Sequence, residues 1–211
     1  MQRPPYSQNA FTLAELLVVI AIIFVLIGLA FPAFNGVQNQ AKKVQAKNDL
    51  IQIVTAVNAF YTEYGRYPVA GQNDVTFTND NSDLFYTLRA VSMGANSSDA
   101  LNPRKIVFIS PPDVKDPNKP RGGIAPSTGI YYDPWGKEDT LPEGGVYHVR
   151  IDENYNNIVA NAYTDGSAGG DPGNSYSLRQ GVIAWSLGKD KTPGRNENNS
   201  FTNSDDVISW Q

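Results

Sequence analysis

The stretch FTLAELLVVIAIIFVLIGLAF, residues 11–31, decides the fold of this chain. Its only charged residue is Glu15, and residues 16–31 are apolar throughout apart from Gly28. As an α-helix the stretch would measure about 30 Å, which is the thickness of the hydrocarbon layer of a bilayer. A helix in a soluble core would be expected to show a polar face, and this one has none. The sequence therefore predicts a membrane-inserted helix.

The residues after this stretch favour its retention in the protein. No Ala-x-Ala site for an ordinary signal peptidase follows the apolar run. Pro32 would normally break or kink a helix, yet apolar residues recur at helical spacing beyond it. They predict an amphipathic continuation over 32–64, ended by the stop signals Gly65 and Pro68. Between Leu50 and Tyr64 the apolar face is expected to pack on the chain's own domain.

Glu15 lies in an unfavourable place for a carboxylate. An ionised side chain inside an apolar stretch costs a few kcal/mol unless it is paired or lies near the membrane interface. Two interpretations follow from position alone: Glu15 lies at headgroup depth, or it pairs with a positive group supplied by another chain.

Residues 10–20, AFTLAELLVVI, resemble the N-terminal signature of type IV pilins and of type II secretion pseudopilins. The signature combines a Phe-Thr-Leu start, a glutamate four residues after the Phe and a long apolar run. The resemblance implies a leader, residues 1–10, which a prepilin peptidase removes between Ala10 and Phe11. It further implies methylation of the new Phe11 amine and neutralisation of that amine by Glu15 of an adjacent subunit. The family usually has Gly where this chain has Ala10, and cleavage is expected to be slower or unchanged.

The charges that flank the apolar run bear on its orientation. The leader has one charged side chain, Arg3, whereas Lys42, Lys43 and Lys47 follow the run. Taken alone, the positive-inside rule would place the region after the helix in the cytoplasm. The family resemblance implies the opposite: a single-pass protein of the inner membrane whose head, residues 65–211, is periplasmic. We follow the resemblance.

The head is predicted to contain a small antiparallel sheet. Alternating and β-branched residues predict strands at 105–109, 146–151, 158–162 and 181–187, and helical spacing predicts a short helix at 82–92. The Pro- and Gly-rich segment 111–129 is expected to be a loop, and Asp133-Pro134-Trp135-Gly136 a type I turn. The fold class is therefore α+β: a long N-terminal helix, membrane-spanning in its first half, packed on a small antiparallel sheet with long loops.

Three carboxylates near the C-terminus are candidate metal ligands. Ser-Leu-Gly-Lys-Asp at 186–190 and Asp-Asp-Val-Ile-Ser-Trp at 205–210 resemble the end of the major pseudopilins, where a loop binds calcium. The resemblance implies that Asp190, Asp205 and Asp206 supply the carboxylates that calcium prefers. Composition alone favours a solvated Asp/Asn turn, and Lys191 replaces the usual Gly.

Composition excludes several other functions. Charged residues make up 18% of the chain and the net charge is -4, so a nucleic-acid partner is not expected. The absence of cysteine removes disulfides and thiol nucleophiles. The single histidine, His148, lies within a predicted strand, and no catalytic motif accompanies it, so an enzyme is not expected.

These observations together predict a structural subunit of a type II secretion pseudopilus that supports protein export. The partners implied by the resemblance are copies of the chain in a filament, prepilin peptidase, other pseudopilins, the inner-membrane assembly platform and membrane lipid. Two alternatives stay open: a type IV pilin or minor pilin, and a membrane-anchored module that binds an extracellular ligand.

Overall fold

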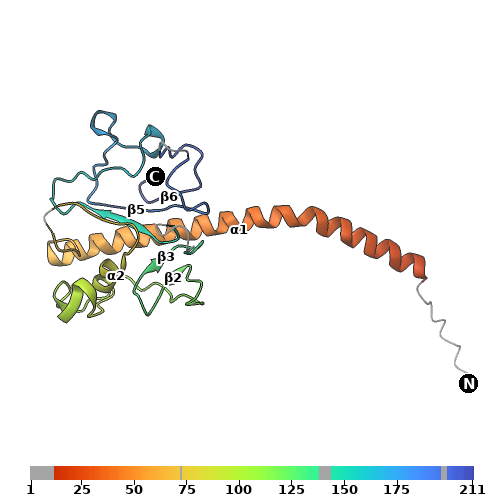
Figure 1. The fold of residues 1–211 in the computed structure, drawn as a ribbon, viewed down its shortest axis with the longest axis horizontal. Helices are drawn as coiled ribbons and strands as arrows, with labels where there is room; N and C mark the ends of the chain where they lie inside the picture. Colours follow the sequence, from red (N-terminus) through yellow and green to blue (C-terminus); the bar gives the residue numbers. More distant parts are fainter. Residues whose placement is uncertain (1–11, 72, 138–143, 196–198) are drawn as a thin grey trace, which may run out of the picture. The chain divides into compact units, whose positions relative to one another are not determined.

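The computed structural model describes residues 12–71, 73–137, 144–195 and 199–211. The chain divides into two units, residues 1–41 and 42–211, and each is taken by itself below. Helix α1, Leu13–Tyr64, contributes to both units (Figure 1). The segments predicted as a membrane helix and an amphipathic continuation are thus parts of one helix, which does not end at Pro32.

Helix α1 ends where the sequence predicts. The backbone N–H of Gly65 donates to the carbonyl of Tyr61 over 2.8 Å, and Gly65 has a φ of +66°. A left-handed residue after the last turn is a common way to end a helix, and glycine adopts it without steric cost.

In the second unit, α1 lies against a four-stranded antiparallel sheet (Figure 1). The strand order is β1-β4-β5-β6. The strands are β1 Val75–Phe77, β4 His148–Ile151, β5 Val182–Ser186 and β6 Val207–Ile208. The predicted strands at 146–151 and 181–187 are confirmed, as are the α+β fold class and the packing of the helix on the sheet.

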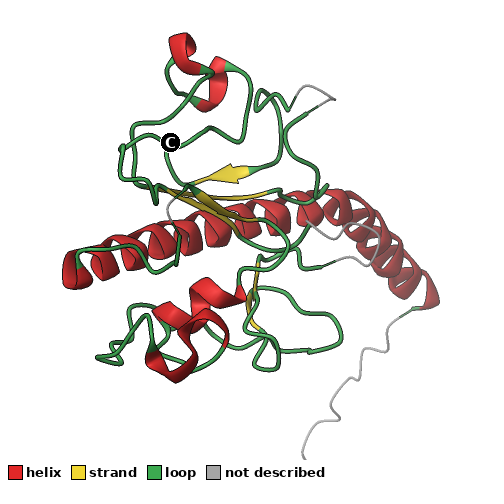
Figure 2. Ribbon diagram, turned by 60° about the vertical axis from the view of Figure 1, so that its left-hand side comes forward, coloured by secondary structure: helices red, strands yellow, loops and turns green. Residues whose placement is uncertain are grey.

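The two faces of the sheet are both buried. Toward the sheet, α1 presents a stripe with steps of three and four residues: Ala46, Leu50, Ile53, Val57 and Phe60. Strand β5 alternates, so that Val182 and Ala184 pack on this stripe. Ile183 and Trp185 point to the other face, into a second apolar cluster that includes residues of the segment between β4 and β5. Loops lie over this face of the sheet in Figure 2. The predicted packing of the Leu50–Tyr64 face is confirmed, although Tyr61 keeps 40% of its surface exposed.

The segment between β1 and β4 forms a smaller lobe. Its elements are α2 Ser82–Leu88, the 3-10 helix η1 Gly94–Asp99 and a two-stranded sheet of β2 Gly123–Ile124 and β3 Tyr131–Tyr132. Two further 3-10 helices, η2 Gly166–Ala168 and η3 Pro172–Asn174, lie in the loops between β4 and β5. The helix predicted at 82–92 is therefore shorter, since Ala90 has a positive φ of 56°. The predicted loop 111–129 contains β2.

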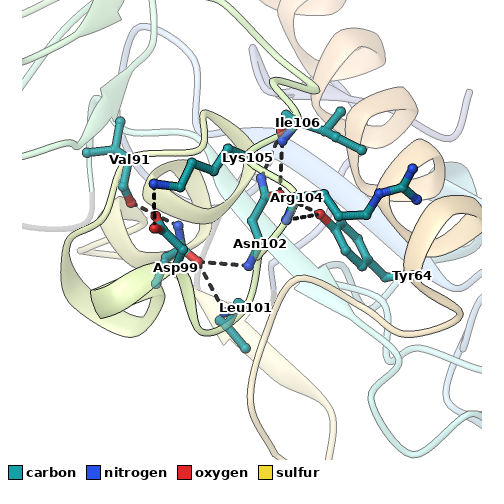
Figure 3. A network of polar contacts seen from close by, with 9 residues as sticks. Tyr64, Val91, Asp99, Leu101, Asn102, Arg104, Lys105 and Ile106 are labelled. Atoms are coloured by element: carbon teal, nitrogen blue, oxygen red, sulfur yellow. Dashed lines mark hydrogen bonds and ion pairs between the residues drawn. The ribbon is translucent and has the colours of Figure 1, made fainter.

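The strand predicted at 105–109 is wrong. Lys105 has a φ of +53°, which no strand residue adopts, and the buried side chain of Asn102 binds the backbone that a neighbouring strand would need. Its amide oxygen accepts from the N–H of Ile106 over 3.1 Å and its nitrogen donates to the Ile106 carbonyl over 2.8 Å (Figure 3). The same oxygen accepts from the Tyr64 hydroxyl at the end of α1, over 2.6 Å.

The strand predicted at 158–162 is also not formed. Val159 makes only an isolated antiparallel bridge to Leu178. The chain bends after Asp133, where Oδ1 of its side chain accepts from the N–H groups of Trp135 and Gly136 over 3.0 and 2.9 Å, and the predicted type I geometry stays a prediction. Oδ2 of Asp133 accepts from the hydroxyl of Ser186 over 2.6 Å, which ties the bend to β5.

Candidate functional site

The start of α1 is closed by a reciprocal pair of side chains. The backbone N–H and the hydroxyl of Thr12 both donate to Oε2 of Glu15, each over 2.8 Å. The N–H of Glu15 donates back to the Thr12 hydroxyl over 3.2 Å. This arrangement is a capping box, in which an N-cap threonine and a glutamate three residues later satisfy amide groups that the first helical turn leaves unpaired.

The capping box changes the interpretation of Glu15. The spacing Thr-x-x-Glu is the sequence signal for such a box, beside the two interpretations of Glu15 given above. The structure gives this carboxylate a local partner within its own chain, Thr12. Pairing of Glu15 with the amine of an adjacent subunit stays a prediction. The predicted cleavage between Ala10 and Phe11, and methylation of Phe11, lie outside the described residues.

The first unit presents an apolar surface along α1. The large side chains between Leu13 and Ile27 all expose 45% or more of their surface, with Phe24 at 71%. No described helix is at once long enough and apolar enough to cross a membrane.

The three candidate metal ligands come together in the second unit. One carboxylate oxygen each of Asp190, Asp205 and Asp206 lies within 4.8 Å of the other two. Asp190 follows β5 in a turn, whereas Asp205 and Asp206 directly precede β6. Because β5 and β6 are antiparallel neighbours, the C-terminal end of β5 lies beside the N-terminal end of β6.

Backbone amides fix one oxygen of each carboxylate. The N–H of Lys189 donates to Oδ2 of Asp205 and that of Gly194 donates to Oδ2 of Asp206, both over 2.7 Å. The N–H of Thr192 donates to Oδ1 of Asp190 over 3.0 Å. Gly188 permits the close approach of the two segments, since a Cβ there would lie 2.6 Å from the Asp205 carbonyl oxygen.

The remaining oxygens fit a hard cation. Oδ1 of Asp205 and Oδ1 of Asp206 are buried, and neither has a hydrogen-bond partner among the described residues. The same holds for the hydroxyl of Ser204, a residue that sequence reasoning missed. Buried acceptors without partners are costly, and a calcium ion satisfies oxygens of this kind. The donor set of this site therefore suits calcium.

The electrostatics of Asp206 agree with this fit. The pKa of Asp206 is raised to about 6, chiefly by burial. The carboxylates of Asp190 and Asp205 act in the same direction, whereas the N–H of Gly194 and the nearby hydroxyl of Tyr163 oppose the shift. An adjacent cation would favour the ionised form of all three carboxylates.

Comparison with known proteins supports the class that these features define. The family model described as "Prokaryotic N-terminal methylation motif" matches residues 6–31. The resemblance to pilins and pseudopilins is thereby confirmed for the N-terminal segment, where the chain carries a prepilin-type methylation motif and is similar to proteins of both kinds.

The similar curated proteins are of two kinds. The type IV major pilin protein PilA of Myxococcus xanthus (strain DK1622) is 42% identical over 59 residues, 28% of this chain and 27% of the pilin. The type II secretion system core protein G of Pectobacterium carotovorum subsp. carotovorum is 34% identical over 67 residues, 32% of this chain and 43% of that protein. Its counterpart in Escherichia coli (strain K12) is 35% identical over 66 residues, 31% and 46% of the two chains. The matches thus span between about a quarter and just under half of these relatives. No solved structure matches.

Proposed function

We propose that this protein is a structural subunit of a type II secretion pseudopilus, held in the inner membrane by α1 before assembly and joined to its neighbours through the same helix. The observation that carries the proposal is the methylation motif at residues 6–31, which includes the apolar, exposed first part of α1 with Glu15 as its one charge. The matches to core protein G favour secretion, and the match to PilA keeps a pilus as the alternative.

The role proposed is mechanical. Exposed Leu, Ile, Val and Phe side chains along α1 gain little specificity from packing on their like or on lipid. A charge pair in a low-dielectric environment can fix the axial alignment of two neighbouring helices. Separating its partners would leave each charge uncompensated, which is costly. Glu15 would therefore set the axial position of each subunit by pairing with the Phe11 amine of a neighbour.

Processing provides the first test. The mature protein extracted from membranes should begin at methylated Phe11, which intact mass spectrometry and fragmentation of the N-terminal peptide would reveal. A mature chain that still contains Met1, or that begins beyond Phe31, would contradict the proposal.

The capping box allows pairing and capping by Glu15 to be separated. Glu15→Gln keeps a side-chain oxygen that can cap the helix but removes the charge. Thr12→Ala keeps the charge but removes the cap, at a cost of about 1 kcal/mol to the helix terminus. If pairing governs assembly, Glu15→Gln and Glu15→Ala should both insert into the membrane and fail to form filaments, whereas Thr12→Ala should assemble.

The measurement is the yield of sheared filaments after co-expression with the assembly machinery, with membrane fractionation to confirm insertion. Thr12→Ser, which keeps the capping hydroxyl, is the matched control. Normal filament yield from Glu15→Gln together with failure of Thr12→Ala would assign Glu15 to helix capping alone and reject the pairing.

We further propose that Asp190, Asp205 and Asp206 hold a calcium ion that stabilises the end of the sheet. The buried, unpaired oxygens of Asp205, Asp206 and Ser204 support this proposal. Calcium supplies no chemistry here beyond charge compensation and cross-linking of the loop before β6. A ligand that binds only the folded state raises stability by mass action, so chelator should lower the melting temperature of the full chain. An unchanged melting temperature with chelator or with added calcium would leave the loop as a plain Asp/Asn turn.

A further inference from the structure

A second polar pocket lies in the second unit, apart from the three aspartates. Three cationic side chains line it from two segments: Lys42 on α1, and Lys115 and Arg121 on the loop that leads into β2. Gln45, one turn after Lys42, adds an amide to the wall.

The backbone around the pocket is tightly fixed. Ile124 of β2 donates to the carbonyl of Pro112 and accepts from the N–H of Val114, both over 2.9 Å. A Cβ at Gly123 would lie 2.6 Å from the Pro112 carbonyl oxygen, so the two ends of the loop before β2 touch through backbone. The N–H of Gly122 donates to the carbonyl of Asp133 over 2.7 Å, which anchors the residue after Arg121. The loop that carries Lys115 and Arg121 is thus held in place.

No pocket cation forms a side-chain ion pair within the described part of the chain. The ion pairs that occur there join Arg104 to Glu63 and Lys105 to Asp99. Burial lowers the pKa of Lys42, the positive charge of Arg121 lowers it further, and the negative charge of Asp133 raises it. Lys189 and Lys191 act in the same direction as Arg121. Such crowding of like charges is relieved when an anion binds.

Two carboxylates, Asp113 and Asp116, also lie on the rim. The N–H of Asn118 donates to Oδ1 of Asp116 over 2.9 Å, so part of this charge is already engaged. Three lining cations outnumber the two lining carboxylates, and outside the lining Lys189 adds a positive charge near Lys42 while Asp133 adds a negative one. The balance at the pocket is positive although the whole chain carries a net charge of -4.

We propose that this pocket binds a phosphate group through Lys42, Lys115 and Arg121. Guanidinium and ammonium groups form charge-assisted hydrogen bonds with phosphate oxygens, and an Arg can bind two of them at once. Two sources share this chemistry: the headgroup of an anionic phospholipid and free inorganic phosphate.

We favour a phospholipid headgroup as the source of the phosphate because of the position of Lys42 in the sequence. This step rests on the function proposed above. Lys42 comes eleven residues after Phe31, the last residue of the apolar run. The wall of the pocket formed by α1 is therefore close in sequence to the proposed membrane segment. Basic residues next to an anionic bilayer each gain about 1 kcal/mol. Bound headgroups would hold a subunit's head at the membrane surface before assembly.

The test titrates the full chain, in a neutral detergent, with three probes by calorimetry. The probes are dihexanoyl-phosphatidylglycerol, dihexanoyl-phosphatidylcholine and inorganic phosphate. Lys42→Gln and Arg121→Gln should each weaken phosphatidylglycerol binding about tenfold, the loss of one charge-assisted hydrogen bond. Lys43→Gln is the matched control, since it removes the same charge from the same helix but from outside the pocket. Asp116→Asn should tighten binding.

The outcomes separate the claims. Binding of phosphatidylglycerol ahead of phosphatidylcholine and phosphate, with the stated effects of the variants, supports the site and its lipid source. Phosphate bound more tightly than phosphatidylglycerol, with the same dependence on Lys42 and Arg121, supports the phosphate site and overturns the lipid source. Equal weakening by Lys43→Gln, or no binding of any probe, overturns the proposal. A Glu15→Ala chain should bind as the wild type does, so a failure of the filament function would be seen separately.

Discussion

Replacing Asp206 by Asn should stabilise the protein in the absence of calcium, and calcium should cancel most of that advantage by stabilising the wild type alone. Asp206 is 6% exposed and its pKa is raised to about 6, mainly by burial. The folded state therefore keeps a proton between about pH 4 and pH 6 that the unfolded chain releases. The free energy of unfolding falls as the pH rises through this window, and the ionised carboxylate is a liability at pH 7.

The size of the effect follows from the shift. With a pKa of about 6 in the folded protein and 3.8 as the ordinary value, the ionised Asp206 costs about 3 kcal/mol at pH 7. Asn keeps an oxygen for the hydrogen bond from Gly194 and carries no charge. Without calcium, Asp206→Asn should therefore be more stable than the wild type at pH 7, by as much as about 3 kcal/mol. With calcium at a hundred times its dissociation constant, the wild type should gain about 2.7 kcal/mol that the variant lacks.

The assay is thermal unfolding of the full chain in neutral detergent, followed by tryptophan fluorescence, at several pH values with chelator or with calcium. In chelator, wild-type stability should decrease as the pH rises from 4 to 7. The stabilisation by calcium should increase over the same range, because the ion binds the deprotonated carboxylates. Asp133→Asn is the control, since burial also raises the pKa of Asp133 to about 6 and its partners are Trp135, Gly136 and Ser186 rather than the aspartate cluster. Equal calcium stabilisation of Asp206→Asn and the wild type would refute the assignment of the site.

Two further predictions concern the polar contacts that hold α1 to the head. Asn102→Ala should lower the free energy of unfolding by about 2–4 kcal/mol in a urea titration, because it leaves buried backbone groups and the Tyr64 hydroxyl without partners; a loss below about 0.5 kcal/mol would contradict this. Tyr147→Phe should cost about 1–3 kcal/mol at pH 7, because the Tyr147 hydroxyl donates to Asp49 over 2.7 Å and lowers a pKa that burial raises. The Tyr147→Phe effect should shrink as the pH falls and Asp49 becomes protonated, and a pH-independent loss would indicate packing instead.

The sequence predicts the elements whose patterns are regular. The long helix and its end at Gly65 follow from spacing and stop signals, and β4 and β5 follow from alternation of apolar residues. The proximity of Asp190 to Asp205 and Asp206 could be predicted only from the family resemblance. Asp190 and Asp205 are fifteen residues apart in the sequence, and the pairing of β5 with β6 brings them together.

The errors arise where one side chain outweighs local propensity. Residues 105–109, Lys-Ile-Val-Phe-Ile, have strong strand propensity. However, the side-chain amide of Asn102 forms hydrogen bonds with both the N–H and the carbonyl of Ile106, and the backbone of Lys105 has a left-handed conformation. A buried asparagine with partners on α1 and α2 is a tertiary feature, so no pattern within the segment could reveal it. The pocket proposed to bind phosphate could not be predicted from the sequence for a similar reason, since Lys42 and Arg121 come together only in the folded head.

Helix capping and subunit pairing by Glu15 are compatible in one side chain. Both donors of Thr12 bond to the same carboxylate oxygen, Oε2, so an amine can approach Oε1 without breaking the cap. Removal of a leader before Phe11 would retain the whole capping box, because Thr12 would become the second residue and would keep its N–H and hydroxyl. The cap also fixes the carboxylate at the first turn of α1, where the helix dipole favours negative charge. A preformed, oriented carboxylate loses less conformational entropy on pairing than a free glutamate would. Thr12→Ala should therefore slow filament assembly or weaken filaments without abolishing them, whereas loss of the Glu15 charge should abolish them.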